Sequence, residues 1–216
     1  MSNLLELNTV RFLPWIGKYY HKGGIFKNRI LVLGEGHHCG GCPREGCEND
    51  FESDCRFFTS NVVKKYLNRK KGYEKWMNTY IKFERSLIGD WTDEESQKNI
   101  WDSIAFYNYI QYALDKSRKA GEGDAYIKAI KPFYQVLDYL KPELIIVWGK
   151  RLWKNLPGDE RWEESVGITM DDGYIIDNGY YKLDNGDKSK VFPVYHPSAG
   201  YDWSYWHKAI ITMLRH

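Results

Sequence analysis

Three short polar segments each end an apolar run, and their side chains are of types that bind a ligand and act on it. Glu35 lies within Gly34-Glu35-Gly36, Asn108 ends the run that begins near Trp101, and His196 opens His196-Pro197-Ser198. An imidazole can donate to a developing oxyanion, an amide can pair with a carbonyl and an N–H, and a carboxylate can orient water. The structural alternatives are that Glu35 braces backbone N–H groups, Asn108 bonds the next turn and His196 caps a strand.

All four cysteines fall in one window, and their spacing is typical of a metal site. Cys39, Cys42, Cys47 and Cys55 form the pattern C-x2-C-x4-C-x7-C. Two thiolates separated by two residues can reach one ion from a tight turn, and the other two can complete a tetrahedral structural zinc site. The alternatives are free thiols, or a site in which His37 or His38 replaces one thiolate.

The elements that would position these groups alternate along the chain. Short apolar runs predict buried strands, and amphipathic spacing predicts helices. We expect strands at 29–33, 101–109, 144–148 and 191–195, helices at 60–68, 72–87, 124–140, 150–156 and 202–215, and a short hairpin or loop insertion within 162–187. Pro132 would kink or divide the third of these helices. This order predicts an α/β fold with an open parallel sheet whose ligand site lies at the carboxyl ends of its strands.

The composition predicts one domain, residues 1–216, with a cysteine-rich metal loop inserted at 39–55. The chain has 43% hydrophobic residues, which is enough to bury a core, and a net charge of only +2. The start of the chain does not resemble a signal peptide and no apolar run approaches a membrane span, so we expect a cytoplasmic protein that does not bind membranes. The 16% aromatic content is high, and we expect some rings to face a groove or partner, where flat side chains stack on bases.

The basic residues cluster at one place in the sequence. Lys64, Lys65, Arg69, Lys70 and Lys71 lie in or just after the helix expected at 60–68. The cluster indicates either a basic face for nucleic acid or a solvated helix surface.

The order of these segments resembles the uracil-DNA glycosylase superfamily over nearly the whole chain, from about Phe12 to Arg215. The residues that carry the resemblance are Gly34-Glu35-Gly36-His37-His38 at the first motif, Phe57 or Phe58 at the stacking aromatic, Asn108 at the strand-end asparagine, Leu144 to Gly149 at the structural strand, and His196-Pro197-Ser198 at the second motif. The resemblance implies a three-layer α/β/α sandwich around a central four-stranded, mostly parallel sheet.

The resemblance also implies an activity: hydrolysis of the N-glycosidic bond of uracil, or of a related damaged base flipped out of DNA. It assigns catalytic roles to His196 and Glu35. Substrate binding would involve Gly34, Gly36, His37, Phe57, Phe58, Asn108, Ser198 and Tyr201, with Tyr201 as a wedge in the minor groove. The partner would be DNA and the protein a monomer.

The first motif departs from the family's pattern. Gly36 stands where many members have Asp or Asn to orient the attacking water, and His37 stands where the family has proline. Glu35, His37 or His38 would then position the water. The alternatives are a catalytically inactive nucleic-acid or nucleobase-binding protein of the same fold, and a protein-interaction role for the aromatic surface. Because one branch of the family holds a four-iron cluster with four cysteines, an iron–sulfur cluster is the alternative to zinc.

Overall fold

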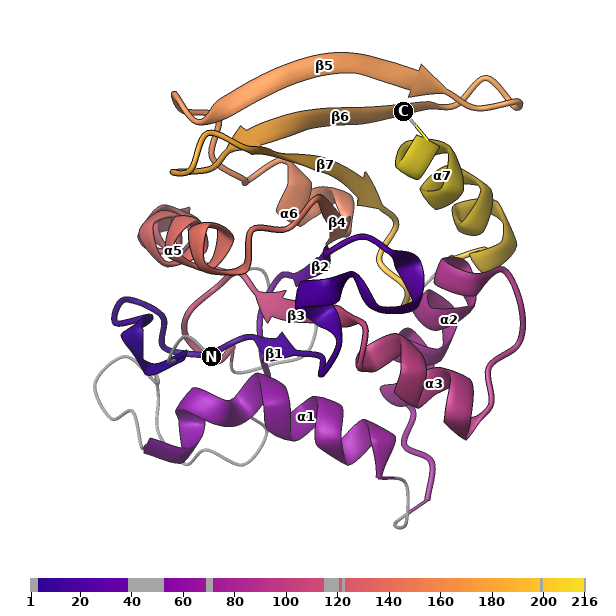
Figure 1. Cartoon of the computed structure of the whole chain (residues 1–216), viewed down its shortest axis with the longest axis horizontal. Coiled ribbons are helices and arrows are strands. Elements are labelled where there is room, and N and C mark those ends of the chain that lie inside the picture. Colours follow the sequence, from indigo (N-terminus) through magenta and orange to yellow (C-terminus); the bar gives the residue numbers. More distant parts are fainter. Residues whose placement is uncertain are drawn as a thin grey trace.

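The structure, a computed structural model, describes residues 4–38, 53–68, 72–114, 121, 123–198 and 200–215. Within these residues seven strands form one mixed sheet, in the order β1-β3-β2-β4-β7-β6-β5 (Figure 1). The strands are β1 (Trp15–Ile16), β2 (Ile30–Gly34), β3 (Ile104–Asn108), β4 (Leu144–Trp148), β5 (Trp162–Thr169), β6 (Ile175–Lys182) and β7 (Lys188–Val194). The predicted α/β class is therefore confirmed.

Four neighbouring strands run parallel and form the centre of this sheet. β2 pairs in parallel with β3 on one side and β4 on the other, and β4 pairs in parallel with β7. The expectation of a four-stranded sheet needs correction, because β1 extends one edge and the β5–β6 hairpin extends the other, all in antiparallel pairing. The hairpin expected within 162–187 is confirmed, and its strands are eight residues long each.

The central strands are apolar along their whole length because helices cover both faces of the sheet. Every residue of β2, β3 and β4 is buried. Successive side chains point to opposite faces, so Leu31 and Leu33 belong to one hydrophobic cluster, whereas Ile30 and Val32 belong to a second one.

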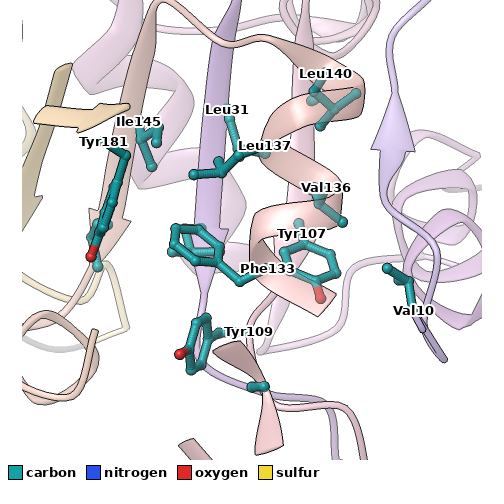
Figure 2. Packing of buried hydrophobic residues seen from close by; sticks show 14 of the residues in the cluster. Val10, Leu31, Tyr107, Tyr109, Phe133, Val136, Leu137, Leu140, Ile145 and Tyr181 are labelled. Carbon is teal, nitrogen blue, oxygen red and sulfur yellow. The ribbon is translucent and has the colours of Figure 1, made fainter. Parts of the chain in front are cut away.

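Helices from different parts of the chain cover the two faces. The helices are α1 (Phe58–Leu67), α2 (Met77–Ile88), α3 (Glu94–Trp101), α4 (Gly123–Lys128), α5 (Ile130–Leu140), α6 (Lys150–Trp153) and α7 (Trp203–Arg215), with short 3-10 helices η1 (Leu4–Glu6), η2 (Tyr20–Lys22), η3 (Gly24–Phe26) and η4 (Ser53–Phe57). Buried residues of α4, α5 and α6 join the first cluster, and those of α1, α2, α3 and α7 join the second. Figure 2 shows Phe133 and Leu137 of α5 lying over Leu31 of the sheet.

Two helical features differ from the sequence prediction. The segment expected as one helix at 124–140 divides at Ala129, and Pro132 falls in the first turn of α5, where a missing N–H costs least. Helix α3 was not predicted, because only its last two residues are buried and hydrophobic. Among the described residues, no helix combines the length and apolar character that crossing a membrane requires.

Candidate functional site at the carboxyl ends of the parallel strands

The strand order identifies one edge of the sheet as the place for a ligand. The chain passes from β2 to β3 on one side and then to β4 on the other side of β2. In open α/β sheets, ligands bind outside the carboxyl ends of the strands, where the direction of winding reverses. The residues that follow β2 and β4 therefore define the centre of the candidate site, and those that end β3 and follow β7 lie to either side.

Glu35 follows β2, and Arg151 follows β4 on helix α6; the two side chains meet across this reversal point. Arg151 Nε donates to Glu35 Oε1 at 2.7 Å, and Arg151 Nη2 donates to Oε2 at 2.5 Å. The Tyr126 hydroxyl, from α4, donates to the same Oε1. Arg151 Nε also lies 3.0 Å from Oε2, so four hydrogen bonds from these two side chains engage both carboxylate oxygens, which offer about four lone-pair positions in total.

The side chain of Asn108, at the end of β3, contacts His37 and fits in the space left by Gly34, which has no side chain. The Asn108 amide nitrogen lies 3.1 Å from His37 Nε2, and His37 Nε2 lies 2.8 Å from Thr59 Oγ1. A Cβ atom on Gly34 would lie 2.3 Å from Asn108 Oδ1. Gly34 and Asn108 are direct partners in the β2–β3 register, so a glycine is required at Gly34 for the amide to take this position.

The His37 ring is buried in an aromatic pocket beside Asn108. It meets the ring of Phe58 edge to face at a centroid distance of 4.5 Å and that of Phe12 at 5.0 Å. Burial lowers the pKa of His37 to about 3. The ring is therefore neutral at physiological pH, which suits a positioning residue better than a proton donor.

His196, two residues after β7 ends, is fixed in one tautomer by Ser198. The backbone N–H of Ser198 donates to His196 Nδ1 at 3.2 Å, and Ser198 Oγ lies 2.8 Å from the same nitrogen. A nitrogen that accepts from an N–H carries no proton, so the neutral ring has its proton on Nε2. Nε2 makes no hydrogen bond with any described residue and is available to donate to a ligand.

The surroundings of His196 keep its ring neutral although the residue is exposed. Desolvation by neighbouring protein atoms lowers the pKa of His196, while the nearby charges of Glu35 and Arg151 act in opposite directions. The ring also packs edge-to-face against Trp148, the last residue of β4, at 6.0 Å. His196 is therefore an uncharged hydrogen-bond donor close to the Glu35–Arg151 pair.

Of the remaining predicted site residues, the structure places some beside the candidate site and others away from it. Phe58 packs on His37 beside the candidate site, whereas Phe57 is 46% exposed. Tyr201 is buried, stacks on Trp206 and donates its hydroxyl to Ser86 Oγ at 2.8 Å. This position holds Tyr201 in the core, away from the surface at which a wedge would act. Gly36 lies beside Leu114, which a Cβ would approach to 3.3 Å.

The metal prediction rests mostly on residues outside the described part of the chain. Cys39, Cys42 and Cys47 lie there, and Cys55, on η4, is a half-buried free thiol. Within the described residues, no three His, Cys, Asp or Glu side chains gather closely enough to hold a metal ion. The four-cysteine site stays a prediction. Arg69, Lys70 and Lys71 of the basic cluster also fall outside the described residues.

Sequence reasoning did not find Arg151, Tyr126 or Thr59, which complete the candidate site. Arg151 carried a usable signal, because it follows Gly149 at the end of the strand that the sequence predicts most clearly. A separate open hollow of about 420 Å³ lies between α6 and the β5–β6 hairpin, with Trp153 and Trp162 in its wall, and none of the predicted site residues line it.

Comparison with known proteins gives no family assignment. No model of a known protein family matches this sequence, and a search of curated proteins finds no match either.

Proposed function

We propose that this protein is a DNA glycosylase of the uracil-DNA glycosylase superfamily, which hydrolyses the N-glycosidic bond of uracil or a related damaged base flipped out of DNA. The observation that carries the proposal is that two polar groups lie at the carboxyl ends of the parallel strands. The Asn108 amide ends β3, and the His196 Nε2 donor follows β7. Three strand spacings separate their backbones, about 14 Å, and the Glu35–Arg151 pair lies between them.

The chemistry of base removal needs the groups found at this edge. As the C1′–N bond breaks, the sugar becomes oxocarbenium-like and negative charge builds on the leaving base. His196 Nε2–H would donate to the base oxygen on which that charge collects. Asn108 would pair with the polar edge of the base, because its amide holds both a donor and an acceptor.

Water must then form the new bond to C1′ as the base leaves. Glu35 would orient this water once the Tyr126 hydroxyl or the Arg151 guanidinium, which both engage its carboxylate, gives up one of these contacts. The exposed face of Arg151 adds a positive charge beside it, which favours a DNA phosphate.

A release assay tests the proposal. A labelled oligonucleotide with a single uracil is incubated with protein whose metal content has been measured, and hypoxanthine and hydroxymethyluracil substrates are run in parallel. We expect base release from at least one substrate, and His196→Ala should slow it by about a hundredfold or more, since losing one oxyanion donor typically costs that much. The control is His21→Ala, an exposed histidine on η2. An unchanged rate in His196→Ala would remove this residue from the mechanism.

A second candidate function is a non-catalytic module that binds a nucleobase or nucleic acid at the same edge. Gly36 favours it, because this position of the motif offers no polar side chain, and so does the Arg151–Glu35 pair, which occupies most of the carboxylate. DNA binding without release of any of the three bases would support this second function.

The four cysteines would hold a structural zinc ion in either case, with four thiolates leaving no open coordination position. Elemental analysis of the purified protein separates zinc from iron, and Cys42→Ser should lower the metal content.

A further inference from the structure

Beside the candidate site, three tyrosine rings gather near the protein surface, and one lysine lies over two of them. They are Tyr174, which precedes β6, Tyr195, which follows β7, and Tyr205 on α7; we call this set the tyrosine platform. The Tyr174 and Tyr195 ring centroids lie 6.3 Å apart, and those of Tyr174 and Tyr205 lie 6.4 Å apart. Lys150 Nζ lies 4.8 Å from the Tyr174 centroid and 5.7 Å from that of Tyr195.

A buried indole supports the platform from below. Trp206 is 2% exposed, and its ring contacts Tyr195 at 5.1 Å, Tyr205 at 5.4 Å and Tyr174 at 6.4 Å. Because Trp206 packs in the cluster that α7 forms with the sheet, the rings are carried by the core. Tyr195 nevertheless remains 41% exposed.

Two residues of the platform region are direct neighbours in sequence of residues in the candidate site. Tyr195 directly precedes His196, and Lys150 directly precedes Arg151, which binds Glu35. Lys150 thus lies over the rings, and Arg151, the next residue, lies in the candidate site. Two acidic groups lie nearby: the Tyr205 hydroxyl donates to Asp172 Oδ1 at 3.3 Å, and Asp177 is close enough for its charge to act on Lys150. Lys150 and Arg151 would attract the phosphates of a bound strand, and the two carboxylates would repel them.

We propose that the tyrosine platform stacks an unpaired base next to the base held at the candidate site, so that the protein acts on single-stranded DNA. This inference rests on the proposed function. Aromatic side chains beside a positive track are how proteins bind single strands without sequence preference, because every base presents a π-face. Bases inside a duplex are stacked on each other and do not offer their faces to tyrosine rings.

The test measures binding separately from catalysis. Fluorescence anisotropy follows a labelled single-stranded oligonucleotide of thymines, and the same strand in duplex with its complement. We expect tighter binding of the single strand, and Tyr195→Ala should weaken it about tenfold or more, the loss typical of one stacked base. Tyr195→Phe should keep most of the affinity because it keeps the ring. Lys150→Gln should weaken binding and reduce its salt dependence.

A matched control pair of a lysine and a tyrosine lies near the amino ends of the parallel strands. Lys18 Nζ lies 5.0 Å from the Tyr19 ring, Tyr19 is 44% exposed, and its backbone bonds Asp102, just before β3 begins. Tyr19→Ala should leave binding unchanged. Unchanged single-strand affinity in a folded Tyr195→Ala, or an equal loss on the duplex, would overturn the inference. Base release by the wild-type protein is scored independently, so a failure of the glycosylase proposal would be seen as binding without release.

Discussion

Two histidines near the carboxyl ends of the parallel strands differ in what surrounds them, and this separates their roles. His37 is enclosed by Phe58, Phe12 and Thr59, whereas His196 keeps Nε2 unengaged among the described residues. The first therefore fixes Asn108, and the second is placed to meet a substrate.

The pH dependence of the reaction should report the neutral form of His196. Desolvation lowers the pKa of His196 below the value of about 6.5 for a free imidazole. The neutral ring, whose Nδ1 accepts from the Ser198 N–H, is thus fully present above pH 6.5. Protonation of Nδ1 as the pH falls through the lowered pKa removes this contact, which holds the ring in place. We expect a base-release rate that is constant across the neutral range and falls in acid. A rate that rises as the pH drops from 7 would show that the charged imidazole is the active form.

Adding the carboxylate that the first motif lacks should increase activity. The backbone of Gly36 is outside the left-handed region, and a Cβ there meets the flexible end of Leu114 at 3.3 Å and Ile110 Cβ at the ordinary contact distance of 3.6 Å. Gly36→Asp should therefore fold. A positioned carboxylate contributes about 10²–10⁴-fold to a rate. We expect single-turnover base release by the variant to be at least about tenfold faster than by the wild-type protein. Gly36→Ala is the control, and an equal gain there would exclude a role for the carboxylate.

At this scale the sequence predicted which strand ends would carry polar groups, but not how those groups contact each other. Asn108 and Glu35 were found because a polar residue after a buried apolar run is unusual. The Asn108–His37 contact and the Glu35–Arg151 pair join residues far apart in the sequence, and an arginine on a short helix is usually a solvated charge. The burial of Tyr201 depends on Ser86 and Trp206, and no local pattern indicates it.

Among the elements, the turn between β4 and α6 positions both Arg151 and His196. Gly149 has φ 96° and ψ 141°, a conformation that only glycine adopts readily, and its would-be Cβ faces His196 Cβ at 3.4 Å. Its N–H donates to Val194 O at 2.9 Å, which ties the turn to the end of β7.

Gly149→Ala should therefore lower the stability of the protein and disturb the candidate site together. Holding alanine in this conformation costs about 1–3 kcal/mol, which a urea unfolding titration can measure. We expect weaker base release as well, since Arg151 follows the turn by two residues. The matched control is Gly158→Ala, where a Cβ meets nothing within 4 Å and φ is not positive. Equal effects of both variants would contradict this role for the turn.

The sequence predicts an element well where its apolar residues form a continuous run or a regular period. β2, β3 and β4 are buried on both faces and appear as apolar runs. Helix α3 shows almost no apolar period, and its real signal is the capping box of Asp93 and Ser96. β1 has two residues and is a strand only because it pairs with β3. Such an element is determined by tertiary contacts.

Over the whole molecule, the core contains one buried hydroxyl whose removal should stabilise the fold. Tyr107 is fully buried in the first cluster (Figure 2), and its hydroxyl has no hydrogen-bond partner among the described residues. An unpaired buried polar group costs about 1–3 kcal/mol. Tyr107→Phe should thus raise the free energy of unfolding by about 1 kcal/mol, measured by urea titration.

Tyr181 gives the opposite expectation within the same cluster. It is equally buried, but its hydroxyl donates to Pro157 O at 2.7 Å. Tyr181→Phe should lower the free energy of unfolding, because the Pro157 carbonyl then loses its donor. If both variants change stability in the same direction, the difference in hydrogen bonding does not control these positions.

The parallel centre of the sheet also determines when the candidate site can form. Its groups come from the ends of β2, β3, β4 and β7, and among these strands the pairing of β2 with β4 joins the residues farthest apart in the sequence, Ile30 with Leu144. Contacts between distant parts of a chain form slowly, because the loop between them must close first. Arg151 can meet Glu35 only after β4 has docked on β2, and His196 joins them only after β7 has docked on β4. During refolding, recovery of ligand binding should therefore coincide with the slowest step of sheet assembly and lag behind the appearance of helical signal.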